Sequence, residues 1–252
     1  MPAAPTISYS AFGFLREKMG FAKEAWESWS RQRIQRTGLV RVHTPWQLYW
    51  GEAYGLELKK WLLKPVFDEL ERTGKVGDLI VDVGSGAQPV TRFLDTKPNR
   101  KRILVDVAAE SGGREDEARI RLDAEKIGEM GMLSFRKALV RACRFVGIAP
   151  GVGNAGADTM VFADLLNYVD FRKVLSGFAS YLKPGGRFVI VNLPMRGNQA
   201  LFSDKGLKDN RLLYEWLESE RFEIEQKSFP CRARNATEEA EELIVLIARK
   251  GA

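Results

Sequence analysis

The chain has 252 residues, of which 45% are hydrophobic and 29% charged, and its formal net charge is +6. These values are typical of an ordinary globular protein and exclude a collagen-like chain, a wholly disordered chain and a bundle of membrane-spanning helices. The two cysteines, Cys143 and Cys231, form no CxxC pair and have no neighbouring histidine, so the sequence predicts neither a disulfide framework nor a metal site.

Residues 1–72 are expected to form a helical segment rich in tryptophan. Five of the six tryptophans precede residue 62, and apolar residues recur at spacings of three and four from Leu56 to Leu70, as in an amphipathic helix. The segment could be a lid over a pocket for an apolar or aromatic molecule, or its rings could simply pack helices onto the rest of the chain. It shows no targeting signal and no long apolar stretch, so we expect a cytoplasmic protein with no membrane partner.

Residues 73–252 are expected to form a second unit, in which short apolar runs alternate with helical patterns. This alternation predicts a parallel sheet with helices on both faces. The expected strands are 78–83, 102–107, 120–123, 158–163 and 187–193, and the expected helices are 89–94, 135–145 and 170–182.

The end of the chain departs from this alternation. After a helix near 207–219, two strands, 221–229 and 241–250, follow each other without an intervening helix, so one of them must run antiparallel to the sheet. The expected fold class is therefore α/β, with a seven-stranded, mostly parallel sheet, one reversed strand, helices on both faces and an N-terminal helical lid.

The run VDVGSGAQP (81–89) places Gly84 and Gly86 between a strand and a helix. Because glycine lacks a Cβ, the backbone can turn sharply there and a ligand can approach the main chain. A dinucleotide-binding fingerprint would need Gly or Ala at position 89, which is Pro89, and the phosphate-loop pattern GxxxxGK[ST] is absent. The turn therefore favours another kind of ligand.

Three acids accompany this turn. Asp82 lies just before it, and Asp106 ends the second strand, 20 residues beyond Gly86, an interval that suits an acid accepting both hydroxyls of a ribose. Asp123 ends the third strand, where it could accept from the exocyclic amine of a purine. The carboxyl ends of neighbouring parallel strands share one edge, so the acids favour a ligand with a ribose and a cationic amino-acid part.

These motifs, in this order, resemble a class I S-adenosylmethionine-dependent methyltransferase over residues 76–250. VDVGSGAQP resembles the family's glycine motif, LVDV its ribose acid and RLDAEKI its adenine-contacting segment. DTMVFADLLNYVD resembles the fourth-strand motif and LKPGGRFVIVNLP the fifth-strand lead. One departure is Gln88, which stands where the family often has a third glycine.

The resemblance implies S-adenosylmethionine as cofactor and S-adenosylhomocysteine as product. The glycine turn would lie against the methionine part and Asp106 would bind the ribose, with Val107 under the adenine and Asp123 and the Ala124 amide at the adenine edge. The carbonyl of Ala163 would face the methionyl ammonium. The acids could instead be helix-cap or turn residues. The implied cofactor-binding residues are Asp82, Gly84, Ser85, Gly86, Asp106, Val107, Asp123, Ala124, Ala163 and Asp164.

Two residues are candidates for catalysis. Methyl transfer depends mainly on placing the nucleophile in line and close to the methyl group, and a base is optional. His43 is the only histidine, and its ordinary pKa suits a base near neutrality. By resemblance, Tyr168 stands where many relatives have a histidine facing the substrate. Either residue could be structural instead.

These features favour methyl transfer to an O or N atom of a small-molecule acceptor, by a monomer or a homodimer. One alternative is an RNA or protein methyltransferase that uses the arginines of 31–41, although the thinly spread charge argues against nucleic acid. Another is a catalytically silent binding protein that has kept the fold. The second basic cluster, 97–102, is expected to be a solvated face at the amino end of the sheet.

Overall fold

The computed structural model describes residues 64, 67–86, 89–94, 97–107, 115–129, 132–148, 156–192, 203–226 and 244–251. Most of the expected lid, with His43 and the arginines of 31–41, lies outside the described residues, as does Cys231; of the expected lid, only residues 64 and 67–72 are described. Within the described part, no helix combines the length and the apolar character that crossing a membrane requires.

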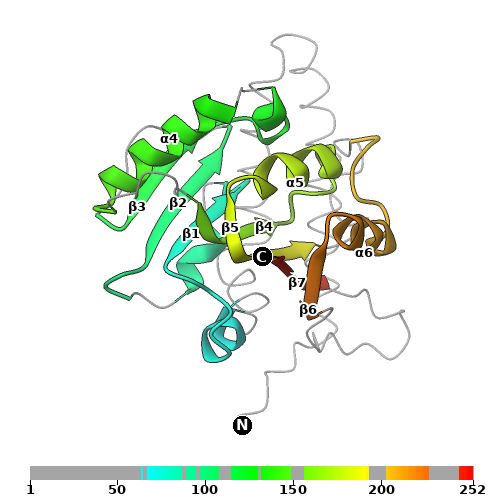
Figure 1. The fold of residues 1–252 in the computed structure, drawn as a ribbon, viewed down its shortest axis with the longest axis horizontal. Coiled ribbons are helices and arrows are strands. Elements are labelled where there is room, and N and C mark those ends of the chain that lie inside the picture. Colours follow the sequence, from blue (N-terminus) through cyan, green and yellow to red (C-terminus); the bar gives the residue numbers. More distant parts are fainter. Residues whose placement is uncertain are drawn as a thin grey trace, which may run out of the picture. The chain divides into compact units, whose positions relative to one another are not determined.

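A seven-stranded sheet forms the centre of the described chain (Figure 1). Its neighbours β3-β2-β1-β4-β5 are all parallel, whereas β7 lies between β5 and β6 and is antiparallel to both. This arrangement confirms the predicted mostly parallel sheet with one reversed strand. The strands are β1 (Leu79–Val83), β2 (Lys101–Asp106), β3 (Glu117–Arg121), β4 (Ala157–Ala163), β5 (Leu182–Asn192), β6 (Phe222–Gln226) and β7 (Ile244–Lys250).

Helices cover both faces of the sheet, as predicted. One face carries α4 (Met132–Phe145), α5 (Phe171–Ala179), α6 (Asn210–Ser219) and the 3₁₀ helix η4 (Ala124–Gly128), whose buried residues belong to one large apolar cluster. The other face carries a helical segment over residues 67–72 and the 3₁₀ helix η3 (Val90–Phe93), which share a smaller cluster.

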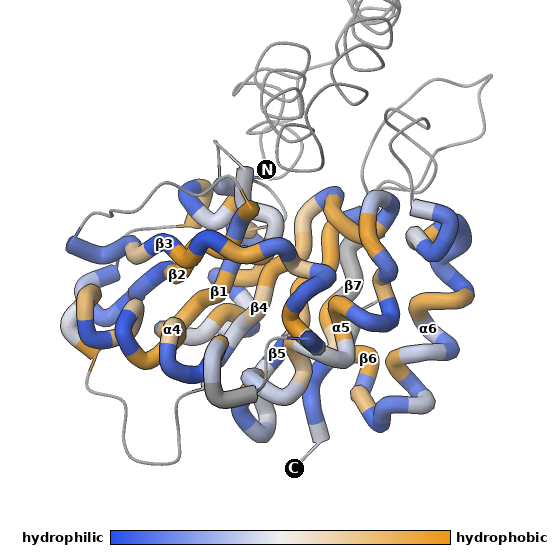
Figure 2. Tube along the Cα trace, turned by 90° about the horizontal axis from the view of Figure 1, so that it is seen from above, coloured by the Kyte–Doolittle hydropathy of each residue, from blue (hydrophilic) through white to orange (hydrophobic). Residues whose placement is uncertain are grey.

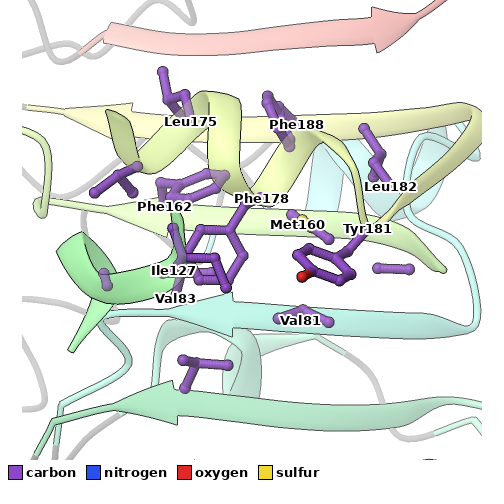
Figure 3. Packing of buried hydrophobic residues seen from close by; sticks show 14 of the residues in the cluster. Val81, Val83, Ile127, Met160, Phe162, Leu175, Phe178, Tyr181, Leu182 and Phe188 are labelled. Carbon is purple, nitrogen blue, oxygen red and sulfur yellow. The ribbon is translucent and has the colours of Figure 1, made fainter. Parts of the chain in front are cut away.

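The two clusters follow from the alternation of side chains along each strand. In β4, Met160 and Phe162 join the larger cluster, whereas Val161 joins the smaller one. Apolar residues accordingly gather along the strands and on the inner sides of the helices (Figure 2). Phe178 of α5 lies edge-on to Phe162, with ring centroids 5.8 Å apart, so aromatic rings fix α5 on the sheet (Figure 3).

Two predicted elements differ from the structure. One is a different kind of helix, and the other begins earlier in the chain. The helix expected at 89–94 is only the four-residue 3₁₀ helix η3, with Pro89 as its N-cap. The third strand is β3, which begins three residues before the expected 120–123. Among the described strands, β3 lies at the edge of the sheet and pairs only with β2, so its exposed arginines do not interrupt it, although in the sequence they obscure the strand pattern.

The helix expected at 170–182 ends at Ala179, and β5 begins at Leu182. The run 183–186, expected to end a helix, therefore belongs to the strand. The register between β4 and β5 shifts between Ala157 and Thr159, opposite this run: Ala157 pairs with Leu182, and Thr159 pairs with Arg187.

The basic cluster 97–102 is a solvated face only in part, because residues 97–99 are exposed but the two arginines are not. Arg100 and Arg102 are buried, and they pair with Glu71 and Asp116, respectively. The expectation failed because the acids that neutralise these arginines lie in other elements, and a local run of charge does not reveal them.

Candidate functional site

Most of the predicted cofactor residues lie in the last residues of β1, β2 and β4 or just after them, and these strands are parallel neighbours in the sheet (Figure 1). Their carboxyl ends therefore share one edge, called the carboxyl edge here. The chain order reverses at β1, because β2 lies on one side of it and β4 on the other. In open parallel sheets such a switch point is where ligands bind.

The glycine turn after β1 is held by the end of β2. The amides of Gly84 and Ser85 donate to the carbonyl of Val105, over 2.8 and 3.3 Å. Gly84 and Gly86 both have positive φ, at 70° and 61°. A Cβ on Gly84 would lie 2.9 Å from a methyl carbon of Leu165, so a neighbouring side chain already occupies the space beside this residue.

Gly86 faces open space. Among the described residues, no atom lies within 4 Å of the position that a Cβ on Gly86 would take. The Gly86 amide donates to Oδ2 of Asp106 over 3.0 Å, so the structure brings the glycine turn and the acid at the end of β2 together. Val107 follows at the same edge, and its carbonyl accepts from Nε of Arg121.

Asp82 takes a different position from the other acids. It is 1% exposed, and its Oδ2 accepts a 2.7 Å hydrogen bond from Oγ1 of Thr91 in η3. It shares the strand face of Ile80, which belongs to the smaller cluster. This carboxyl therefore fixes the chain on either side of the glycine turn.

Asp123 lies two residues beyond the end of β3, not at the strand end that we expected. It is the N-cap of η4 and accepts from the amide of Glu125 over 3.1 Å. A helix-capping role for this acid is one of the alternatives considered above. Ala124 is 8% exposed and packs into the larger cluster, so the two residues share one short turn beside β3.

The loop after β4 contacts both the glycine turn, through Leu165, and β5, through Asp164. Asp164 has φ 51°, an uncommon value outside glycine, and its amide donates to Val191 of β5 over 2.7 Å. Ala163 pairs with Val191 as the last residue of β4. Tyr168 is half-buried, and its amide donates to the carbonyl of Leu165, the residue packed on Gly84.

Two side-chain amides at this edge were not predicted from the sequence. Asn167 and Asn192 are buried, and Nδ2 of Asn192 donates to Oδ1 of Asn167 over 3.0 Å. The chain at 203–207 packs on the same loop so closely that a Cβ on Gly206 would lie 2.2 Å from the Asn167 carbonyl. The available signal was one asparagine shortly after the expected strand 158–163 and another inside the expected strand 187–193, but their pairing depends on the strand order.

One cysteine lies in the described residues. Cys143 is buried in α4, and burial raises the pKa of its thiol, as is usual for an unreactive cysteine. No three histidine, cysteine or acidic side chains of the described part come together as metal ligands.

Comparison of the fold with solved structures finds methyltransferases. The chain is similar to an O-methyltransferase family protein of Burkholderia thailandensis, with a TM-score of 0.53, 14% identity and coverage of 93% of this chain and 71% of that one. It is also similar to Bradyrhizobium japonicum NodS, an N-methyltransferase solved with S-adenosylhomocysteine, with a TM-score of 0.52, 13% identity and coverage of 88% and 99%.

A third similar structure is human N-acetylserotonin methyltransferase in complex with S-adenosylmethionine, with a TM-score of 0.50, 15% identity and coverage of 87% of this chain. The match spans 58% of that longer enzyme, which is less than two thirds of its length. No protein-family model and no curated protein sequence matches the chain. The chain has the fold of class I S-adenosylmethionine-dependent methyltransferases.

Proposed function

We propose that the protein is an S-adenosylmethionine-dependent methyltransferase that acts on an O or N atom of a small-molecule acceptor in the cytoplasm. The observation that carries this proposal is the contact between the Gly86 amide and Asp106 at the switch point of the sheet. It places a carboxylate, which can accept from ribose hydroxyls, beside a backbone turn that a ligand can approach closely.

The residues at the carboxyl edge fit this cofactor. The open space beside Gly86 leaves room for a ligand against the backbone, as the methionine part would require. In the proposed site Gly84, Ser85 and Gly86 lie against that part, and Asp106 binds the ribose. Asp82 is buried and hydrogen-bonded to Thr91, and it supports the turn from the sheet face of the smaller cluster.

The remaining cofactor contacts are proposed from the segments after β2, β3 and β4. Val107 packs against the face of the adenine, and Asp123 and the Ala124 amide hydrogen-bond to the edge of its ring. The carbonyl of Ala163 faces the methionyl ammonium, and Asp164 flanks it. The bound cofactor supplies an electrophilic methyl group on a sulfonium.

Catalysis then requires the protein to hold the acceptor in line with that methyl group, and proximity and orientation provide most of the rate enhancement. We assign the acceptor pocket to the tryptophan-rich segment 1–72, with Tyr168 orienting the acceptor from the loop after β4. An amine with a free lone pair needs no base, whereas a hydroxyl would be assisted by His43.

Calorimetric titration with S-adenosylhomocysteine tests the cofactor site. We expect micromolar binding by the wild-type protein, none of NADH, and a loss of at least about tenfold in affinity for Asp106→Ala, because the ribose loses an ionised acceptor. Asp78→Ala is the matched control: Asp78 is exposed and lies at the amino end of β1, opposite the site. Equal affinities of Asp106→Ala and wild type would contradict the assignment.

Turnover separates methyl transfer from silent binding. The protein is incubated with S-adenosylmethionine and a panel of small hydroxyl and amine compounds, and formation of S-adenosylhomocysteine is measured. Cofactor binding without turnover on any acceptor would favour the catalytically silent alternative.

A macromolecular acceptor is the second candidate, and one surface favours it. The outer side of α4 exposes four basic residues, Arg136, Lys137, Arg141 and Arg144, and the helix contains no acidic residue. If this side binds RNA, affinity for a labelled single-stranded RNA must fall steeply with salt and with Arg141→Ala. Salt-independent affinity would exclude this role.

A further inference from the structure

The glycine turn leads into a short 3₁₀ helix. η3 has only four residues, and within it the amides of Arg92 and Leu94 donate to the carbonyls of Pro89 and Thr91 over 3.2 and 3.3 Å. So few backbone bonds define a helical turn poorly, because each ordered residue costs conformational entropy. Contacts from outside η3 must therefore fix the exit of the glycine turn.

One such contact bridges the turn itself. Asp82 lies two residues before Gly84, and Thr91 lies five residues after Gly86. Their side chains are 1% and 0% exposed, and Oγ1 of Thr91 donates to Oδ2 of Asp82 over 2.7 Å. The Thr91 amide points to the same oxygen at 3.4 Å. The pair closes the glycine turn as a loop whose two ends cannot separate without breaking a buried hydrogen bond.

Two arginines tie η3 to the neighbouring strands. Nη1 of Arg102 in β2 donates to the Thr91 carbonyl over 3.4 Å, and this arginine also pairs with Asp116. Arg92 of η3 makes two hydrogen bonds to Glu117 of β3, over 3.1 and 2.8 Å. Thr91 is thus the residue where the bridge across the turn and the ties to the sheet meet.

We propose that Thr91 is a positioning residue for the glycine turn. Acting through Asp82, it holds the Ser85 amide on Val105 and the Gly86 amide on Asp106, and so preorganises the turn for the ligand. The identity of that ligand rests on the proposed function, whereas the effect of Thr91 on the turn rests on the contacts alone.

The test compares Thr91→Val, which keeps the shape but removes the hydroxyl donor, with Thr91→Ser, which retains it. Thr159→Val is the matched control. Thr159 is also fully buried, and its Oγ1 accepts from the Gly77 amide over 3.0 Å at the amino end of the sheet. All variants are made in the full chain, and their unfolding free energies are measured in urea.

Two measurements are then made. The first is hydrogen exchange of individual amides by NMR in the ligand-free protein. We expect Thr91→Val to speed exchange at Ser85 and Gly86 by about tenfold relative to wild type, with Thr91→Ser close to wild type. Thr159→Val should leave both amides unchanged. The second is the dissociation constant for S-adenosylhomocysteine, which should rise by about tenfold in Thr91→Val only.

The outcomes separate the inference from the proposed function. Unchanged exchange at Ser85 and Gly86 in Thr91→Val, or equal acceleration by Thr159→Val, overturns the role of Thr91 whatever the ligand. If wild type does not bind S-adenosylhomocysteine, the proposed cofactor is wrong, and the exchange rates still decide whether Thr91 holds the turn. Wild-type affinity in Thr91→Val would also overturn the preorganising role.

Discussion

Gly84 and Gly86 share a left-handed backbone, but their surroundings give them different roles. An alanine at either position must adopt positive φ, which costs about 1–2 kcal/mol. At Gly84 the added methyl group would also overlap Leu165, which costs about 1–3 kcal/mol more. We therefore expect Gly84→Ala to lower the free energy of unfolding, measured in urea, by more than Gly86→Ala does.

Ligand binding should show the reverse order. A methyl group on Gly86 would enter the open space beside the turn, so Gly86→Ala should weaken binding of S-adenosylhomocysteine. Gly74 is the matched control, because it also has positive φ and an open Cβ position but lies at another turn. Gly74→Ala should lose as much stability as Gly86→Ala and bind normally. Weakened binding in Gly74→Ala would contradict a local effect at the glycine turn.

At the scale of elements, α5 approaches η4 closely enough that one glycine decides their spacing. A Cβ on Gly177 would lie 2.3 Å from Cγ2 of Ile127, whose side chain is 2% exposed. Gly177→Ala gains about 1 kcal/mol in helix propensity. The overlap in a packed core outweighs that gain, so we expect a net loss of about 1–3 kcal/mol in the free energy of unfolding.

A double variant identifies the cause of that loss. Ile127→Ala removes the overlapping carbons, so Gly177→Ala should cost less stability in that background than in wild type. Ser176→Ala, at an exposed position of the same helix, should be neutral or slightly stabilising. Additive losses in the double variant would show that the overlap with Ile127 is not responsible.

The elements that the sequence predicted best are those whose own residues determine them. β1, β2 and β4 are nearly continuous apolar runs because a central parallel strand is buried on both faces. The helix expected at 89–94 is reduced to η3, and the contact of Thr91 with Asp82 of β1 could not be predicted from the local sequence. β3 was displaced in the prediction because an edge strand tolerates exposed arginines.

The same distinction applies to the candidate site. The interval from Gly86 to Asp106 is the length of the chain from the glycine turn through η3 to the end of β2. The sequence alone therefore indicated that the two residues belong together, and they hydrogen-bond in the structure. The pairing of Asn167 with Asn192 requires β4 and β5 to be neighbours in the sheet. Sequence spacing carries no such information.

At the scale of the whole molecule, partly buried ion pairs join elements that lie far apart in the sequence. Glu71 of the helical segment 67–72 pairs with Arg100, and Glu117 of β3 pairs with Arg92. Burial alone would raise the pKa of both glutamates, and it is the largest single influence on each. The hydrogen bonds and charges of their basic partners together outweigh it, so both pKa values lie below the ordinary value.

This balance makes stability depend on pH. A carboxyl with a lower pKa in the folded than in the unfolded chain stabilises the fold above its unfolded pKa, here about 4.5 for glutamate, and the stabilisation is lost as the pH falls through the folded pKa. We therefore expect the free energy of unfolding, measured in urea, to fall from about pH 4.5 downwards. Glu117 should contribute strongly, because its side chain is only 2% exposed.

Glu117→Gln tests that contribution. At pH 7 the variant should lose about 2 kcal/mol, because Arg92 keeps only an uncharged hydrogen-bond partner. Its further loss between pH 7 and pH 3 should be smaller than that of wild type, since one of the titrating groups is gone. Glu223→Gln is the control, since the exposed pair of Glu223 with Arg249 contributes little. If Glu117→Gln lost as much stability on acidification as wild type does, the acid sensitivity would arise from other carboxyls.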